Sequence, residues 1–292
     1  MLDGRPKLPA LGVTLFGALL LWVGCGGPPA ATTPKGTQMP AAGGKQGRAA
    51  CMPNLAACEK ACDARDADAC TAAGMAYAGG NGATRDDARA TALFQKGCDA
   101  GGLIACNELG VRIDRGVGAP GDSAKAVEIF RKACDGKEMH ACSNLGQAYF
   151  AGRGADKDPA RAVVLFRQAC DSGFALSGCS RLAAAYFLGQ GIGKDVAAAA
   201  AQAKKACDGE EPEGCFLLGA MHYDGDGVPK DPAKSAALFK KACDQDYAEA
   251  CTSLAMLYTD GVGVAKDAAR GKELFELACK GGSPRACSAL GR

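Results

Sequence analysis

A pair of cysteines recurs through most of this chain at a nearly fixed interval. One copy reads ACDQDYAEAC, from Ala242 to Cys251, and its two cysteines stand eight positions apart. Successive first cysteines are 36 residues apart, except for one step of 37. A period of this size is typical of repeat proteins, in which each repeat mainly contacts its neighbours. The seven pairs are Cys62 with Cys70, Cys98 with Cys106, Cys134 with Cys142, Cys170 with Cys179, Cys207 with Cys215, Cys243 with Cys251, and Cys279 with Cys287.

The residues after each second cysteine predict a helix with one apolar face. Cys142, Leu145, Gly146 and Tyr149 stand at i, i+3, i+4 and i+7, which share one face of a helix. A Gly-x-Gly turn such as 152–154 then ends the helix, because glycine readily adopts the positive φ found at helix C-termini. The small fourth position predicts close approach of a neighbouring helix.

A second helix is predicted before each first cysteine. An Asp stands twelve residues before six of these cysteines and is a good N-cap, since its carboxylate accepts the free amide hydrogens of the first turn. Five of the six helices carry a bulky pair such as Leu165-Phe166, whereas the fourth has Gln202-Ala203. We expect thinner packing there, from sequence drift or from a hinge. The six capping residues are Asp86, Asp122, Asp158, Asp195, Asp231 and Asp267.

Each unit is therefore a helix pair, and helix pairs in series stack into a superhelix with a concave face. The combination of Cys-x-x-Leu-Gly-x-x-Tyr, Gly-x-Gly-Val, Lys-Asp-Pro and Leu-Phe-x-Lys-Ala-Cys resembles the Sel-like repeat (SLR) of the tetratricopeptide clan. It is most similar to the cysteine-rich secreted Sel-like repeat proteins of bacteria. The resemblance covers residues 51–292. It implies an all-α, α/α superhelical repeat solenoid of about six 36-residue repeats.

The cysteines are predicted to form disulfides rather than metal sites. The first cysteine of a pair ends one helix and the second begins the next, which can bring their Cα atoms within the roughly 4.4–6.8 Å that a disulfide needs. Seven residues between ligands does not fit zinc fingers, which use about two to four. Of the 17 cysteines, the seven pairs and Cys25 leave Cys51 and Cys58, which we expect to pair; free thiols are the alternative.

The first 50 residues predict export. Arg5 and Lys7 precede an uncharged, mostly apolar run over 8–23, which is short for a membrane span and fits a secretory signal. Gly24-Cys25 resembles a bacterial lipobox, although Trp22 stands where Leu is usual. We expect a signal peptide over 1–24, a lipidated Cys25 and a Gly/Pro/Ala-rich disordered tether over 25–50, followed by the solenoid over 51–292. An ordinary cleaved signal and an uncleaved anchor are the alternatives.

The predicted location is the cell envelope, as an outer-membrane lipoprotein that faces the periplasm or the exterior. Gly26 directly after Cys25 resembles lipoproteins sorted to the outer membrane. The chain carries 34 basic and 32 acidic residues, so its charge gives no reason to expect nucleic acid or an anionic membrane surface as a partner. We therefore expect membrane contact only through the lipid anchor.

No catalytic motif stands out. Ser-x-x-Lys, Lys-Thr-Gly, Gly-x-Ser-x-Gly and His-Glu-x-x-His do not occur, and the only histidines are His140 and His222. His222 replaces the Tyr of the repeat and is predicted to pack in the core, whereas His140 is predicted at the surface or in the groove. We expect no metal and no cofactor. Some cysteine-rich relatives are described as penicillin-binding or β-lactamase-like, so the resemblance implies a β-lactam hydrolase or cell-wall-peptide binder as the alternative function.

The leading prediction is an exported, monomeric scaffold that binds protein or peptide partners on its concave face. Positions one, five and eight after each second cysteine are predicted to line that face. Their aromatic members could form a ladder for an extended peptide, or could instead pack between repeats. The residues predicted to contact a partner are Asn107, Ser143, Gln147, Phe150, Phe187, Phe216, Tyr223 and Thr252.

Overall fold

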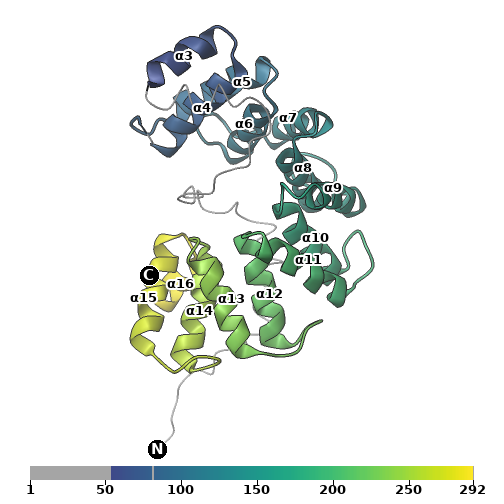
Figure 1. Ribbon diagram of the computed structural model, residues 1–292, viewed down its shortest axis with the longest axis vertical. Helices are drawn as coiled ribbons and strands as arrows, with labels where there is room; N and C mark the ends of the chain where they lie inside the picture. The colour runs from purple at the N-terminus through teal and green to yellow at the C-terminus, as the bar shows by residue number, and fades with distance from the viewer. Residues whose placement is uncertain (1–53, 81, 292) are drawn as a thin grey trace, which may run out of the picture. The chain divides into compact units, whose positions relative to one another are not determined.

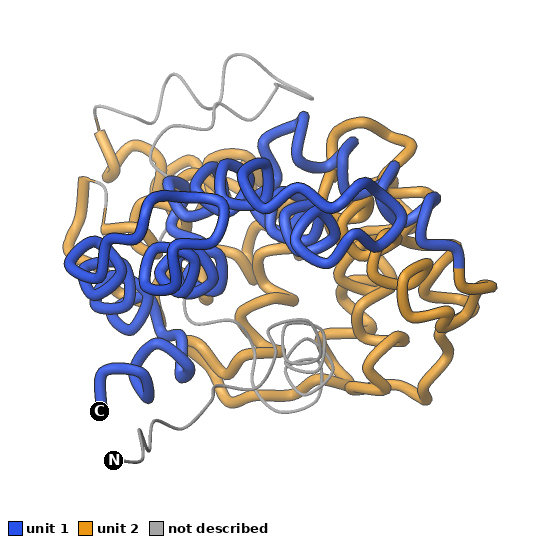
Figure 2. Tube along the Cα trace, turned by 90° about the horizontal axis from the view of Figure 1, so that it is seen from below, with its two compact units in different colours: residues 1–31, 195–292 blue, residues 32–194 orange. Residues whose placement is uncertain are grey.

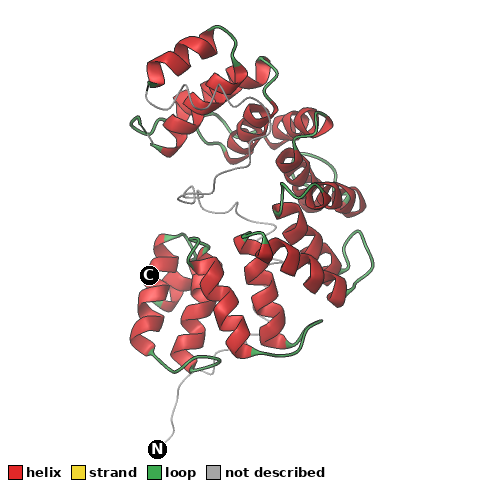
Figure 3. Ribbon diagram, in the orientation of Figure 1, coloured by secondary structure: helices red, strands yellow, loops and turns green. Residues whose placement is uncertain are grey.

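The fold is known from a computed structural model, which describes residues 54–80 and 82–291. Over these residues it contains 14 helices and no strand (Figures 1 and 3), which confirms the predicted all-α repeat fold. The predicted signal peptide, Cys25 and the tether lie outside the described residues. The helices are α3 (Leu55–Asp63), α4 (Ala67–Gly79), α5 (Asp87–Asp99), α6 (Leu103–Arg115), α7 (Ser123–Asp135), α8 (Met139–Ala151), α9 (Pro159–Asp171), α10 (Ser177–Leu188), α11 (Val196–Asp208), α12 (Pro212–Asp224), α13 (Pro232–Cys243), α14 (Ala248–Asp260), α15 (Ala268–Lys280) and α16 (Pro284–Ala289).

The described chain divides into two compact units (Figure 2). The N-terminal unit, residues 54–194, contains α3 to α10, and the C-terminal unit, residues 195–291, contains α11 to α16. The even-numbered helices from α4 to α14 each contain the second cysteine of a pair and are called A helices here. Odd-numbered helices from α5 to α15 end near a first cysteine and are called B helices. None of the described helices is long and apolar enough to cross a membrane.

The predicted Asp caps begin all six B helices. The Asp158 side chain, for example, accepts a hydrogen bond from the Arg161 backbone N–H (2.9 Å), and the other five caps make the same contact three residues on. This bond satisfies one of the free amide groups in the first turn. The position of each Asp in the sequence therefore predicts correctly where the B helix begins.

Glycine four residues after the second cysteine allows a B-helix phenylalanine to lie against bare backbone. A Cβ atom on Gly146 would lie 2.7 Å from Phe166 Cε1, which is too close for a real contact. The same relation joins Gly74 to Phe94, Gly110 to Phe130 and Gly219 to Phe239. In α11, Gln202-Ala203 replaces the Leu-Phe pair, and the C-terminal unit begins at the Asp195 N-cap of that helix.

From Gly118 onward, the second glycine of each Gly-x-Gly turn packs against the backbone of the preceding repeat. Gly154 has φ +72°, and a Cβ there would overlap the carbonyl oxygen of Ser123, at the start of α7. Gly118 contacts Asp87 in the same way, and Gly227 contacts Val196. Only glycine tolerates both the left-handed backbone and this close approach. The turn therefore connects neighbouring repeats, besides ending the helix.

All seven predicted cysteine pairs form disulfides. Each bond closes a short loop across one joint between helices and stabilises by about 2.5 kcal/mol in the chain-entropy model. So many disulfides indicate an oxidising compartment. The bonds and their Cα–Cα distances are Cys62 to Cys70 (4.6 Å), Cys98 to Cys106 (4.5 Å), Cys134 to Cys142 (4.6 Å), Cys170 to Cys179 (4.6 Å), Cys207 to Cys215 (4.4 Å), Cys243 to Cys251 (4.7 Å) and Cys279 to Cys287 (4.7 Å).

The eighth predicted pair joins Cys58 to a residue outside the described part of the chain. Cys58 on α3 is buried at 1% exposure and packs in a core cluster with Cys62, Cys70 and Leu93. Cys51 lies outside the described residues. The bond between Cys51 and Cys58 therefore stays a prediction.

Candidate partner-binding surface

One face of each A helix in the N-terminal unit remains accessible. On α6 the residues at positions two, five and nine after Cys106 are partly or fully exposed, while most others are buried. These positions lie on the side of the helix opposite the cysteine, at about 100° per residue. Together with their equivalents on α8 and α10 they form what we call the A-helix stripe: Glu108, Val111, Arg115, Asn144, Gln147, Ala151, Arg181, Ala184 and Leu188.

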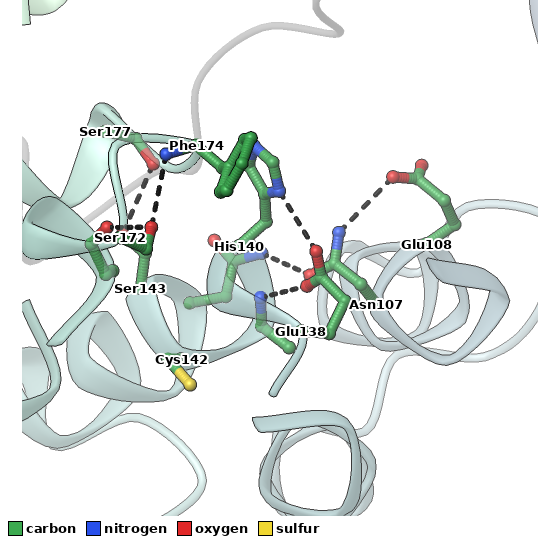
Figure 4. A network of polar contacts seen from close by, with 12 residues as sticks. Asn107, Glu108, Glu138, His140, Cys142, Ser143, Ser172, Phe174 and Ser177 are labelled. Carbon is green, nitrogen blue, oxygen red and sulfur yellow. Dashed lines mark hydrogen bonds and ion pairs between the residues drawn. The ribbon is translucent and has the colours of Figure 1, made fainter. Parts of the chain in front are cut away.

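A row of hydrogen-bonded polar side chains crosses three consecutive A helices along this stripe. Asn144 Nδ2 donates to Asn107 Oδ1 (2.9 Å), which joins α8 to α6. Arg181 Nη1 donates to Asn144 Oδ1 (3.3 Å) and to Ser143 Oγ (2.5 Å), which joins α10 to α8. Figure 4 shows part of the network from close by. The members of this polar row are Asn107, Glu108, Ser143, Asn144, Ser177 and Arg181.

Two carboxylates lie at the α6 and α8 end of the polar row. Burial raises the pKa of Glu108, and the Glu138 carboxylate raises that pKa further, against the opposing effects of Asn107, Arg112 and His140. Glu138 caps α8, because its Oε2 accepts a hydrogen bond from the Ala141 backbone N–H, and its Oε1 lies 3.0 Å from His140 Nδ1 (Figure 4). This part of the surface is therefore acidic, and its negative charge is only partly compensated.

The last turn of α6 carries the opposite charge. Arg115 follows Glu108 by seven residues, about 10 Å along the helix. Burial lowers the pKa of Arg115, and the like charge of Arg153 lowers it further. Arg153 forms an ion pair with Asp114 (2.6 Å), which also accepts a hydrogen bond from Ser123 Oγ (2.8 Å). Along α6 the A-helix stripe is thus acidic at Glu108 and basic at Arg115.

The structure separates the eight residues predicted to contact a partner into two groups. Five are buried: Asn107 (7% exposed), Ser143 (0%), Phe150 (6%), Phe216 (4%) and Thr252 (1%). The other three, Gln147, Phe187 and Tyr223, are partly exposed. Asn107 and Ser143 belong to the polar row, and Gln147 lies next to it on the A-helix stripe. Direct contact of the buried five with a partner stays a prediction.

The aromatic candidates make contacts inside the fold. The Phe150 ring lies 6.0 Å from Phe166, and the Phe216 ring lies 5.6 Å from Phe239 and 5.4 Å from Tyr247, measured between ring centroids. Phe187 lies under the Lys194 ammonium group, and Tyr223 under that of Lys230. Packing between helices therefore accounts for Phe150 and Phe216 without a ligand.

Sequence reasoning missed position two, which supplies Glu108, Asn144 and Arg181. The apolar positions of each A helix are centred near the second cysteine. Positions one and eight lie about 100° and 80° from that cysteine, at the flanks of the apolar face. Positions two, five and nine lie about 140–180° away. A helical projection of the repeat was enough to find the stripe, and it would have placed Asn107 and Phe150 at the buried flanks.

The two histidines lie in different environments. His222 is 5% exposed, and its Nδ1 lies 3.0 Å from the Pro229 carbonyl oxygen, as expected for a packed residue. The His140 side chain is 37% exposed beside Glu138. Within the described residues, no group of three or more His, Cys, Asp or Glu side chains could hold a metal ion.

Comparison with known proteins identifies the repeat. Six consecutive segments match the Sel1 repeat, a scaffold typical of protein–protein interaction: residues 67–102, 103–137, 140–174, 176–210, 212–247 and 248–283. Each segment consists of one A helix, the B helix that follows it and the joint to the next repeat. No curated protein matches this chain.

Two solved structures resemble the chain over most of its length. One is c5321, a protective antigen of uropathogenic Escherichia coli strains that displays an SLR fold, with 32% identity over 82% of this chain and a TM-score of 0.60. The chain spans about half of that protein, 51% of its length. The other is a Sel1 repeat protein from Oxalobacter formigenes, with 26% identity, coverage of 80% of this chain and 67% of that one, and a TM-score of 0.63. The chain belongs to the Sel1 repeat family.

Proposed function

We propose that this protein is an exported interaction scaffold that binds an extended segment of a partner protein along the A-helix stripe of its N-terminal unit. The observation that supports the proposal most strongly is the polar row, which places hydrogen-bonding side chains on three consecutive A helices. Sel1 repeat proteins generally bind protein partners. On each A helix of the N-terminal unit, the side chains of the stripe reach solvent while the flanking positions hold the helices together.

The chemistry of the stripe suits a peptide backbone. Side-chain amides such as those of Asn144 and Gln147 both donate and accept hydrogen bonds, which matches the alternating N–H and C=O groups of an extended chain. Packed helices lie about 8–10 Å apart, which corresponds to about three residues of extended peptide. From the axis of α6 to that of α10 there are two such distances, or about six residues, and a segment of about nine residues also covers the outer halves of both helices.

The proposed setting is the bacterial envelope. The seven disulfides indicate an oxidising compartment, and the sequence before residue 51 predicts a cleaved signal, a lipidated Cys25 and a tether. In this proposal the concave face of a monomeric solenoid holds the partner while the lipid anchors the chain to the outer membrane. None of the described contacts favours the β-lactam hydrolase alternative over binding.

Site-specific photo-crosslinking in intact cells tests the proposal. A photoreactive phenylalanine analogue is placed in the full-length chain at Gln147, on the stripe, and separately at Glu128, which is exposed on the B helix α7. We expect a discrete crosslinked partner from position 147 and none from position 128. Val111 serves as a second probe position on the stripe. Equal crosslinking from positions 147 and 128 would reject the A-helix stripe as the binding surface. The absence of crosslinking from both stripe positions, 147 and 111, would reject it as well.

A further inference from the structure

The joint between α9 and α10 differs from the other six. Cys170 and Cys179 stand nine positions apart, instead of eight, and Phe174 in this joint is 62% exposed. Its backbone N–H donates to Ser172 Oγ (3.2 Å), which in turn donates to the Ala169 carbonyl oxygen (2.6 Å). These bonds order the loop, so the ring is held in solvent by a defined backbone.

Phe174 occupies a position that has another purpose in neighbouring repeats. The fourth residue after the first cysteine is the N-cap of the next A helix in the other joints, as Glu138 is for α8. In the longer joint the N-cap of α10 is Leu176, so Phe174 is released from that role. A single exposed apolar side chain is ordinary on its own. Figure 4 draws Phe174 together with Ser177, the α10 member of the polar row, and with Glu138 and His140 at the start of α8.

The second observation concerns the hydrogen bonds and charged neighbours of the Glu108 carboxylate. The only hydrogen bond that it accepts from the described residues comes from Asn107 Nδ2 (3.3 Å). Arg112, a cation one turn further along α6, donates instead to Asp87 and Thr91. Glu138 has both of its oxygens engaged, by Ala141 and His140. Glu108 is therefore a half-buried acid beside a second acid, without a directly bound cation from this part of the chain.

We infer that the partner segment carries a Lys or Arg side chain that binds Glu108, and an apolar side chain a few residues away that packs on Phe174. The inference rests on the proposed function and adds the chemistry of the partner. Charge complementarity supports it, because a cation placed at Glu108 would offset both the desolvation of that carboxylate and its repulsion by Glu138. Phe174 offers apolar area, and its ring face can also accept the stem or head of a cationic side chain.

Selection from a random nine-residue peptide display library tests the inference. The bait is the oxidised full-length protein, and selected peptides are then measured on variants by fluorescence anisotropy. We expect the enriched peptides to combine Lys or Arg with an aromatic or aliphatic residue. Glu108→Gln and Phe174→Ser should each weaken binding by about tenfold, as for truncated side chains at the centre of an interface. Higher salt should weaken binding to the wild type more than to Glu108→Gln.

Matched controls keep the outcomes distinct. Glu128→Gln removes an exposed carboxylate from α7, and Val164→Ser removes an exposed apolar side chain (64%) from α9, and both should leave binding unchanged. Acidic or uncharged consensus peptides, binding that survives both Glu108→Gln and Phe174→Ser, or no enrichment at all would overturn the inference. If selected peptides crosslink at position 147 but tolerate Glu108→Gln, the stripe stands and only the partner chemistry is wrong.

Discussion

The two units build the same repeat with different side chains at the same places. Positions one and two after the second cysteine are Asn107 and Glu108 on α6 in the N-terminal unit, but Phe216 and Leu217 on α12 in the C-terminal unit. The first pair belongs to the polar row and leaves Glu108 partly exposed. The second pair is buried, at 4% and 2% exposure.

The difference shows which parts of the repeat are free to vary. Disulfides, Asp caps and Gly-x-Gly turns recur in both units, so the backbone does not depend on positions one and two. Those positions can hold neighbouring helices together by hydrogen bonds, as in the N-terminal unit, or by aromatic packing against Tyr247, as in the C-terminal unit. Only the first solution also leaves polar groups that a partner can reach.

Removal of the aromatic contact in the C-terminal unit should have the largest effect. Phe216→Ala deletes a buried ring that packs on Phe239 and Tyr247 and should cost about 3–5 kcal/mol of unfolding free energy. Hydrogen exchange measured by mass spectrometry should show lost protection in residues 212–247, while the N-terminal unit keeps its protection. Equal loss in both units would mean that they do not respond separately.

The turn glycines should matter equally in both units. Gly154→Ala and Gly227→Ala each place a Cβ against the backbone of the preceding repeat and strain a positive φ, at a combined cost of about 2–4 kcal/mol. Urea unfolding followed by circular dichroism measures it. Gly101→Ala is the control, since Gly101 has φ +93° but nothing within 4 Å of the added atom, and only the strain of about 1–2 kcal/mol applies. A cost for Gly154→Ala no larger than the control would contradict the proposed docking role.

These shared features are also the ones that the sequence could predict. The Asp caps, the helix ends and the cysteine pairs depend on residues within about one turn or one short joint of each other, where local rules apply. The contact of Gly154 with Ser123 joins residues in neighbouring repeats, so the sequence indicated a turn but not its docking. The same holds for Arg181 and Ser143, whose bond depends on how the helices stack.

The candidate site was predicted only approximately for a related reason. The predicted positions one, five and eight include one position of the A-helix stripe, position five, whereas positions one and eight lie at the flanks of the apolar face. Asn107 and Ser143 therefore hold repeats together, and Asn144 and Arg181 beside them present the accessible groups. The one-residue insertion before Cys179 was visible in the sequence, but its consequence for Phe174 required the backbone of the joint.

A double-mutant cycle on the polar row should give an intermediate effect. Asn144→Ala removes the acceptor of the Arg181 bond and the donor to Asn107, and should cost about 0.5–1.5 kcal/mol. Because Arg181 shares one of these bonds, Asn144→Ala combined with Arg181→Ala should cost less than the sum of the single changes. Unfolding midpoints in urea measure all four proteins. Strict additivity would show that the bond contributes nothing to the row.

In the C-terminal unit, one substitution is expected to increase the stability of the fold. Ser235 on α13 is fully buried, and its hydroxyl has no hydrogen-bond partner among the described residues. Ala90, Ala126 and Ala162 fill the same place in the N-terminal unit, at 0–1% exposure. Ser235→Ala should therefore stabilise the protein by about 1 kcal/mol, because an unsatisfied buried hydroxyl is removed. Thermal unfolding should show a higher midpoint, and a lower one would indicate a hidden partner for the hydroxyl.

Glu108→Gln should have the smallest effect on stability, with a characteristic pH dependence. Burial raises the pKa of Glu108 in the folded protein above its value in the unfolded chain, so the folded state binds more protons between the two values. Its stability therefore falls as pH rises through this window. Glutamine does not titrate, so the variant should be slightly more stable than wild type at pH 7. The gap should close as the pH falls below the ordinary glutamate pKa of about 4.3.

Urea midpoints from about pH 4 to 8 measure this difference, with two controls. Glu128→Gln on α7 reports the general effect of one lost negative charge at an exposed site. His140→Asn in both backgrounds removes the nearby imidazole, which also interacts with Glu108. Arg112, Arg115 and Glu138, the other charged groups that interact with Glu108, stay unchanged. A gap that widens toward low pH would mean that the charged form of Glu108 stabilises the fold, and the acidic end of the polar row would then already be compensated without a partner.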